Sequence, residues 1–350
     1  MQKEVDYIIV GDGYAALFFA HQLMKHQKAF VLFSDSEKSA SQISAGIINP
    51  VVLKKFTTFW LAAEQIEFLS KTLNEIQNFT GKNYQISENI HRIFHDEKEK
   101  ELWLSKSETE ELAPFLAKDF ENLDTILNPF GTGAVKNSAR LNVEDFFTDF
   151  NSYFKKNGHL KAEKFDYAEL HGLTYKEITA KNIVFCEGMG VSKNPFFKDI
   201  PVIPNKGHHL KVKLSVKPKN EYTIKKKHFL FPLNNGLHYY GGTYDPLERE
   251  KEIDDFATQQ LIDGLSEFYP HSFEVVEINY GFRPTVKDRR PILGSHAEFP
   301  NYFIFNGLGA RGILNGCFFA DELFQHIENG KELMKEVDVK RFENKKFIRL

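Results

Sequence analysis

The chain has 350 residues, of which 42% are hydrophobic and 27% are charged, and its formal net charge is -3. This composition is typical of a globular protein and excludes a disordered or membrane-embedded chain, while the length suits two domains or one domain with a large insertion. The charge gives no overall basic field that would attract nucleic acid or anionic lipid.

The cysteines and the N-terminus bear on the compartment. Only Cys186 and Cys317 occur, far apart and each in an apolar setting, which argues against a disulfide framework. Neither has metal-ligand spacing. The first residues contain no long apolar segment, and no apolar run reaches the roughly 18 residues that a membrane helix needs. We therefore expect a soluble, cytoplasmic protein without a membrane segment or a bound metal.

The N-terminal stretch predicts a strand, a glycine turn and a helix. Residues 7–10 are a short apolar run, and residues 15–24 have the apolar content of a packed helix. Between them, residues 11–16 have the spacing Gly-x-Gly-x-x-Ala that is typical of a dinucleotide-binding turn.

Each small residue of this turn has a physical reason. Gly11 permits the tight turn, Gly13 lets backbone N–H groups approach a pyrophosphate, and Ala16 lets the helix touch the strand. The unpaired N–H groups and the positive dipole end of the helix near Tyr14 would face the phosphates.

A second strand is predicted over residues 29–33, and it ends at Ser34-Asp35. Asp35 stands near the place of the acid that binds the ribose of a dinucleotide. With both halves of the signature present, a dinucleotide site is favoured over a strand-to-helix turn that binds nothing.

The middle of the chain alternates helices with short strands. After residue 35, small and polar residues over 39–50 predict a loop without a regular strand, and helical spacing predicts a helix over 57–79. Further predicted elements are a strand over 90–94, a charged helix over 97–104, a strand over 131–135, a helix capped by Asn142, and an apolar strand over 183–186 that ends near Gly188.

The last part begins with a β-rich region. Alternating residues over 204–280 predict an antiparallel sheet with a hairpin at Asn234-Asn235-Gly236. A strand over 303–305 then runs into a second glycine-rich turn, residues 307–313, and a helix to residue 327. A second turn of this kind implies that the dinucleotide-binding domain is assembled from separate segments.

The order of these motifs resembles the D-amino-acid oxidase-like family of FAD-dependent amine oxidoreductases, which includes glycine and sarcosine oxidases. The resemblance spans nearly the whole chain. Besides the first glycine turn, it rests on Ser44-Ala45-Gly46, Pro204-Asn205-Lys206-Gly207-His208, Phe231-Pro232 with Gly241-Gly242-Thr243, and Arg283-Pro284 with Asp288, Pro291 and Gly294. The ending Gly307-Leu308-Gly309-Ala310-Arg311-Gly312 is most similar to the flavin domain of the bifunctional enzyme that trims the wobble-uridine side chain of bacterial tRNA.

The resemblance implies an α/β fold with two parts: a discontinuous Rossmann-like FAD-binding domain and a substrate domain built on a mixed or antiparallel β-sheet. We expect residues 1–80, 139–203 and 281–350 to form the FAD-binding domain. Residues 81–138 and 204–280 are then expected to form the substrate domain.

The resemblance also implies a non-covalent FAD, because no Cys or His matches an attachment motif. Its pyrophosphate would lie on the first glycine turn, and its isoalloxazine by residues 44–46 and the second turn. The cofactor-binding residues that we predict are Gly11, Asp12, Gly13, Tyr14, Ala15, Ala16, Ser34, Asp35, Ser44, Ala45, Gly46, Gly188, Gly307, Gly309, Ala310, Arg311, Gly312 and Ile313.

Three departures from the family pattern concern the ligands. Ser34 stands where the family usually has Glu for the adenosine ribose. Asp12 places a carboxylate beside the phosphate turn, which is acceptable only if it points away. Phe229 stands where glycine oxidase-like enzymes tend to have a pocket Tyr, which speaks against plain glycine or sarcosine as the substrate.

Three residues are predicted to act on the substrate. Arg283 matches the family's carboxylate-binding arginine, and a bidentate guanidinium suits a carboxylate; the alternative is a structural bond to Asp288 or to a neighbouring backbone carbonyl. Arg311 is the second candidate, the alternative being a solvent-facing residue at a helix start. Tyr244 is the third, and Tyr239 and Tyr240 either line the pocket as well or belong to the core.

The predicted function is oxidation of the C–N bond of a small amino acid or secondary amine that bears a carboxylate. The partners are that substrate and dioxygen or another electron acceptor. One alternative is removal of a carboxymethylamino group on tRNA, which the net charge does not favour. The others are a non-catalytic FAD-binding protein and, last, an NAD-dependent dehydrogenase.

Overall fold

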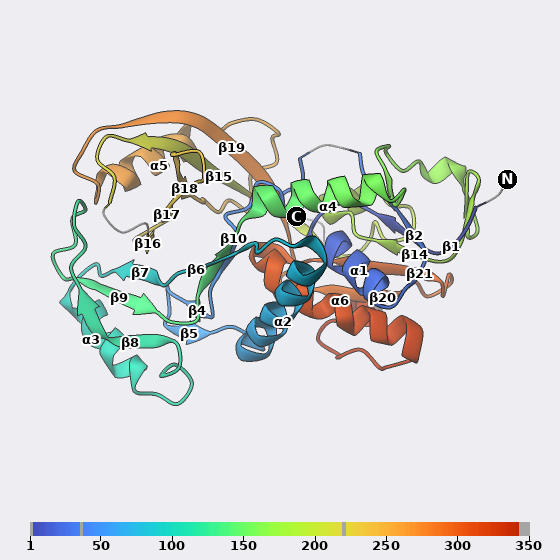
Figure 1. The fold of residues 1–350 in the computed structure, drawn as a ribbon, viewed down its shortest axis with the longest axis horizontal. Helices are drawn as coiled ribbons and strands as arrows, with labels where there is room; N and C mark the ends of the chain where they lie inside the picture. Colours follow the sequence, from blue (N-terminus) through green and yellow to red (C-terminus); the bar gives the residue numbers. More distant parts are fainter. Residues whose placement is uncertain (1–2, 36–37, 219–221, 343–350) are drawn as a thin grey trace.

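Strand β1 (Lys3–Val10) lies inside an eight-stranded sheet that forms one lobe of the molecule (Figure 1). In this computed structural model, which describes residues 3–35, 38–218 and 222–342, β1 runs parallel to its neighbours β2 and β14. The other strands of this sheet are given by their bounds: β2 (Phe30–Phe33), β11 (Leu160–Lys161), β12 (Leu170–His171), β13 (Thr174–Tyr175), β14 (Ile178–Phe185), β20 (Ile292–Ser295) and β21 (Tyr302–Asn306). Strands β11 and β21 extend the parallel part, and β13 and β20 pair antiparallel with their neighbours.

The apolar run in β1 is continuous because this sheet is covered on both faces. Tyr7 and Ile9 belong to one core cluster, and Ile8 and Val10 belong to another on the opposite face. A parallel strand buried in this way carries no polar alternation. The predicted strand and helix over residues 7–24 are confirmed as β1 and α1 (Tyr14–Lys25).

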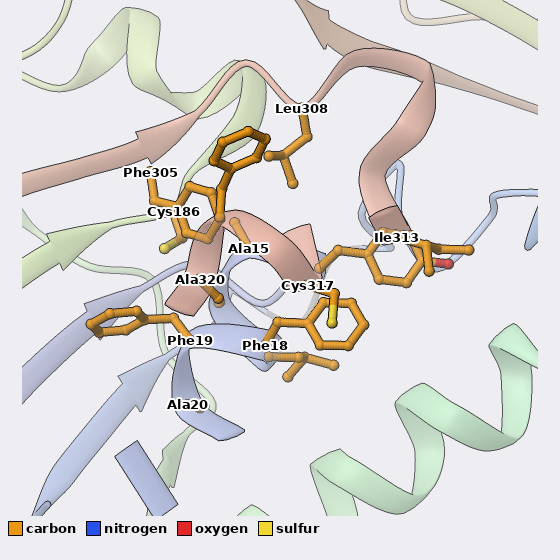
Figure 2. Packing of buried hydrophobic residues seen from close by; sticks show 14 of the residues in the cluster. Ala15, Phe18, Phe19, Ala20, Cys186, Phe305, Leu308, Ile313, Cys317 and Ala320 are labelled. Carbon is orange, nitrogen blue, oxygen red and sulfur yellow. The ribbon is translucent and has the colours of Figure 1, made fainter. Parts of the chain in front are cut away.

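Helix α1 packs against α6 (Gly312–Asn329) beneath the sheet, with small residues between larger ones. Figure 2 shows Ala15, Ala320 and Cys317 lying among Phe18, Phe19 and Phe305. Helix α4 (Val143–Lys156) adds a phenylalanine face, and Asn142 Oδ1 caps it by accepting from the Asp145 backbone N–H at 3.3 Å, as predicted.

Helix α2 (Ala62–Thr80) corrects one prediction. The helix expected over 57–79 begins only at Ala62, because Leu61 has a left-handed backbone with φ of 56°. Before it, β5 (Thr57–Thr58) pairs with β4 (Val51–Val52). The loop expected over 39–50 also contains a short strand, β3 (Ile47–Ile48), which pairs with β10 (Ala139–Leu141), itself paired with β6 (Gln85–Ser87).

The second lobe is another eight-stranded sheet, antiparallel except where β16 runs parallel to β7. Its strands, in spatial order, are β19 (Phe273–Thr285), β15 (Ile203–Leu214), β18 (His238–Gly241), β17 (Phe229–Pro232), β16 (Thr223–Lys225), β7 (Ile90–Ile93), β9 (Thr132–Val135) and β8 (Leu116–Glu121). Helix α5 (Asp255–Ser266) packs against one face with Leu210 and Leu230, and α3 (Glu97–Ser107) lies near β8.

The fold class expected from the sequence is therefore confirmed: a mixed α/β chain whose first sheet is assembled from three separated segments. The domain boundaries expected from the sequence remain a prediction. The predicted domains also contain residues 1–2, 36–37, 219–221 and 343–350, which lie outside the described residues. In the described part of the chain, no helix is long and apolar enough to cross a membrane.

Candidate active site

The first glycine turn leads from β1 into α1 and packs against the end of β14. Gly11 has φ of +115°, and a Cβ on it would lie only 2.4 Å from the Cys186 carbonyl oxygen, so the turn admits no side chain there. Helix α1 follows directly, with Gly13 at its N-cap and no acidic residue in its first turn; Gly13 has no side chain to cap the helix, and the Tyr14 N–H donates to Ser41 Oγ. The positive end of this helix therefore meets no acidic side chain of its own first turn, which suits an anion.

Tyr14 is the point where the predicted cofactor segments meet. Its hydroxyl lies 2.8 Å from Ser44 Oγ, within hydrogen-bonding distance, and its backbone N–H donates to Ser41 Oγ at 3.1 Å. On the other side, a Cβ on Gly312 would lie 2.8 Å from the Tyr14 ring. Residues 11–16, 44–46 and 307–313 are thus brought together around one buried side chain, as their proposed common role requires.

The loop at residues 44–46 and the second glycine turn are held by contacts to their backbone. Gly46 has φ of +69°, and its carbonyl accepts the Leu141 N–H at 2.8 Å. Gly307 packs against Val286, and Asn315 Nδ2 donates to the Leu308 carbonyl at 3.0 Å. Gly309 has φ of +61°, Ala310 is exposed and Ile313 is buried.

Gly188 joins the same region from β14, because its carbonyl accepts from Asn306 Nδ2 at 2.9 Å. Like α1, helix α6 has no acidic residue in its first turn and, in the part of the chain described, no side-chain cap. Two positive helix ends and a lining of glycines fit an extended, anionic dinucleotide, so these residues fit FAD.

Asp12 points away from the phosphate turn, which answers the concern raised by the sequence. It is nine-tenths buried, and its carboxylate accepts a 2.7 Å hydrogen bond from Ser34 Oγ at the end of β2. Burial raises the pKa of Asp12, against the opposing effect of the Ser34 hydrogen bond, and the Asp35 charge raises it further. Because Ser34 carries no carboxylate, we predict that Asp12 accepts from the ribose, and Asp35, the acid expected from the sequence, stays the other predicted acceptor.

Replacing Asp12 with asparagine is expected to raise the FAD dissociation constant about tenfold, the effect of one lost charge-assisted hydrogen bond of ~1.5 kcal/mol. Because the folded-state pKa of Asp12 is raised, its ionisation costs stability as the pH rises above the ordinary value of 3.8. The FAD-free variant should therefore unfold at a higher temperature than the FAD-free parent at neutral pH, and at a similar temperature near pH 3. Titration of FAD fluorescence and thermal scans measure both, and an unaltered FAD affinity would exclude the ribose role.

Arg283 lies on the face of the second sheet that is turned away from α5. Its Nη1 donates to the Thr243 carbonyl at 3.1 Å and to Asn205 Oδ1 at 3.5 Å, and its Cζ lies 4.2 Å from the centre of the Tyr244 ring. The backbone beneath the guanidinium carries no side chain at Gly207, where a Cβ would lie only 2.3 Å from Nη1. The guanidinium is thus held between a glycine and a tyrosine ring.

Of the structural alternatives for Arg283, the ion pair with Asp288 is wrong, whereas a hydrogen bond to a neighbouring backbone carbonyl, that of Thr243, is present. Asp288 Oδ2 instead accepts from Arg341 Nε at 3.1 Å. Within residues 3–35, 38–218 and 222–342, Arg283 has no acidic partner. Gly281 lies on the same face two residues earlier, and a Cβ on it would lie 2.4 Å from Ile43 Cδ1, so the loop before Ser44 covers this face. The guanidinium is therefore a cation without a counter-ion beside the predicted flavin segments.

A row of stacked side chains forms the surface next to Arg283. His209 stacks on Tyr239 at 4.6 Å between ring centres, Tyr239 stacks on Phe231 at 4.6 Å, and Arg140 Cζ lies 4.3 Å above Phe231. Burial lowers the pKa of His209 to about 3, so its ring is neutral at physiological pH. Tyr240 points to the other face and belongs to the core around α5.

Tyr244 and Arg311 lie at the rim of this surface. Tyr244 is 64% exposed, although its ring covers Arg283. Arg311 is half-buried with its Cζ 4.6 Å from the centre of the Phe59 ring, so it does not simply face solvent.

Five residues of this site were given no role in it from the sequence, although Phe231 and Gly242 belong to the motifs that carry the resemblance: Ser41, Gly242, His209, Phe231 and Arg140. A Cβ on Gly242 would lie 3.0 Å from Arg283 Nη2, so this glycine also makes room for the guanidinium. The alternation of residues along β15 and β18 predicts that the sheet has two different faces, but not which face lies toward the cofactor. Only the register of β15 with β19 places Asn205 opposite Arg283.

Comparison with known proteins agrees with this geometry. The family model described as FAD dependent oxidoreductase matches residues 6–325. The fold is similar to that of glycine oxidase from Geobacillus kaustophilus, with a TM-score of 0.79 at 17% identity over 99% of this chain and 100% of that one. It is also similar to iminodiacetate oxidase from Chelativorans sp. BNC1, with a TM-score of 0.76 at 17% identity over 94% of this chain and 97% of that one.

A third similar structure is L-alpha-glycerophosphate oxidase from Mycoplasma pneumoniae, solved with FAD bound, with a TM-score of 0.67 at 12% identity over 92% of this chain and 94% of that one. The likeness of residues 307–312 to the tRNA-modifying enzyme finds no support in these comparisons. The family match spans most of the chain, and the chain therefore belongs to the FAD-dependent oxidoreductase family and uses FAD as its cofactor.

Proposed function

We propose that this enzyme oxidises the C–N bond of a small amino acid or secondary amine and that Arg283 binds the carboxylate of that substrate. The observation that carries the proposal is the Arg283 guanidinium, which has no acidic partner among the described residues and lies on Gly207 beneath Tyr244. A planar cation held in this way offers two parallel N–H groups to a carboxylate. Two of the similar structures are oxidases of glycine and of iminodiacetate, which are carboxylate-bearing amines.

The division of labour follows from what surrounds the guanidinium. Bound FAD would accept a hydride from the substrate carbon next to the nitrogen, and dioxygen or another acceptor would reoxidise the flavin. Arg283 orients the substrate through its carboxylate, and the rings of Tyr239 and Phe231 exclude water from the apolar surface beside it. His209 is neutral and does not deliver a proton, and a neutral amine needs no strong base.

We also propose that the predicted cofactor residues bind FAD, with residues 11–16 at its pyrophosphate and residues 44–46 and 307–313 at its flavin. Both helix N-termini of this region lack acidic residues in their first turns, which supports the assignment. We also propose that the FAD-binding and substrate domains divide at the boundaries expected from the sequence.

The test is anaerobic mixing of the purified FAD-loaded protein with matched pairs of amines that differ only in the carboxylate, such as sarcosine and dimethylamine or proline and pyrrolidine. We expect loss of flavin absorbance with at least one carboxylate-bearing amine and none with its partner. If no amine bleaches the flavin, or if both members of every pair do so equally, the proposal is wrong.

A further inference from the structure

Three more arginines gather at the rim of the proposed substrate site. Arg290 Cζ lies 4.2 Å from the centre of the Trp60 ring, and Arg311 stacks on the neighbouring Phe59. Because Phe59 and Trp60 are consecutive residues, these two guanidinium groups lie over neighbouring rings, and Arg289 directly precedes Arg290. Burial lowers the pKa of Arg311, and the charges of Arg289 and Arg290 lower it further. We call Arg289, Arg290 and Arg311, with their aromatic supports, the arginine mouth.

The arginine mouth adjoins Arg283. The turn that carries Arg311, residues 309–311, packs directly against β19, the strand that carries Arg283. The second glycine turn lies against the strand that carries Arg283, since a Cβ on Gly309 would lie 3.7 Å from Thr285. A ligand anchored at Arg283 therefore has the mouth beside it.

The mouth has no internal counter-charge. Across the residues that the structure describes, none of its three guanidinium groups forms an ion pair, whereas Arg92, Arg140 and Arg341 each pair with a carboxylate. Asp288, the acid nearest in sequence, is taken up by Arg341 and by the backbone N–H of Arg290. Clustered like charges repel one another unless an anion joins them.

Arg289 lies in the turn between β19 and β20. Its backbone N–H donates to the Val286 carbonyl at 2.9 Å, and its φ is +59°, in the left-handed region that glycine adopts without strain. Glycine can therefore replace Arg289 and remove the guanidinium without straining this turn.

We propose that the arginine mouth binds a second anionic group of the substrate, so that the preferred substrate is an amine with one carboxylate at Arg283 and a further carboxylate or phosphate on its other arm. This inference rests on the proposed function, because it uses Arg283 as the first anchor. Guanidinium planes stacked on Phe59 and Trp60 leave their N–H edges open, and carboxylates and phosphates both accept from such edges in a bidentate way.

The test uses the FAD-loaded enzyme and three N-substituted glycines of matched length: N-butylglycine, N-(3-carboxypropyl)glycine and N-(3-phosphonopropyl)glycine. We expect at least one dianionic compound to reduce the flavin with a second-order rate constant tenfold or more above that of N-butylglycine, and the better of the two identifies the group. A preference that weakens as salt is raised agrees with a charged mouth.

Variants locate the effect. Arg289→Gly relieves the left-handed strain, so its fold should be retained, and Arg290→Met keeps a long apolar side chain against Trp60. Each is expected to lower the ratio of dianionic to monoanionic rate constants by about fivefold or more. The control is Lys118→Met on β8, at the opposite edge of the sheet from β19, which removes one positive charge and should leave the ratio unaltered.

The outcomes separate the two proposals. If N-butylglycine reacts as fast as the dianionic compounds, or if the two variants keep the ratio of the parent, the mouth is not a subsite, and the role of Arg283 stands. If none of the carboxylate-bearing amines reduces the flavin, the proposed function fails and this inference fails with it.

Discussion

Replacing Arg283 by leucine is expected to lower kcat/KM for a carboxylate-bearing amine by roughly 10- to 150-fold, which corresponds to the ~1.5–3 kcal/mol of a charge-assisted pair. The loss arises because leucine offers the substrate carboxylate neither a charge nor N–H groups, and the neighbouring Phe231 ring cannot replace them. Steady-state kinetics on the FAD-loaded variant, with flavin content measured first, give the result.

Two further variants show whether geometry or charge matters. Arg283→Lys keeps the charge but loses the paired N–H groups, so it should recover only part of the activity. Gly207→Ala leaves Arg283 in place in the sequence, yet its Cβ would lie 2.3 Å from Nη1 and must displace the guanidinium. Activity of Gly207→Ala equal to that of the parent would mean that the observed position of the guanidinium is not the productive one.

Replacing Gly11 by alanine is expected to give protein that does not retain FAD and unfolds at a lower temperature. The new Cβ would lie 2.4 Å from the Cys186 carbonyl oxygen, a backbone atom that cannot move without shifting β14, and φ of +115° is unfavourable for alanine. Together these effects should cost roughly 2–4 kcal/mol of folding free energy. Flavin absorbance after gel filtration and chemical denaturation measure the two losses.

The matched control is Gly158→Ala. Gly158 also has a positive φ, of +71°, but a Cβ there would meet nothing within 4 Å. This variant should lose about 1 kcal/mol at most and keep its FAD. If Gly158→Ala were as damaging as Gly11→Ala, the contact with β14 would not be the cause.

The first glycine turn and the fold class are predictable from the sequence because their signals are local. The buried strand, the two glycines and the helix over residues 7–24 follow one another directly in the sequence, so the pattern can be read from consecutive residues. The cap at Asn142 and the hairpin at residues 234–236 are confirmed for the same reason. The family resemblance added the order of distant segments, which local patterns do not contain.

The remaining features depend on contacts between strands far apart in sequence. The direction of the Asp12 carboxylate follows from Ser34, which the parallel pairing of β1 with β2 places beside it. Arg341 binds Asp288, so that among the residues described Arg283 has no acidic partner, and no spacing rule connects those residues. The start of α2 depends on the left-handed backbone at Leu61, where propensity alone would continue the helix upstream.

Tyr14 has a consequence for biosynthesis. The segments that it joins leave the ribosome at very different times, since Ser44 follows soon after Tyr14 and Gly312 lies far downstream. Until Phe303 is made, Val184 has no neighbour on that side, and a nascent chain exposes an apolar edge strand open to aggregation. The vitamin-derived cofactor can be captured in full only once Gly312 has been made, so nascent chains that stop before this residue should yield apoprotein that chaperones must hold.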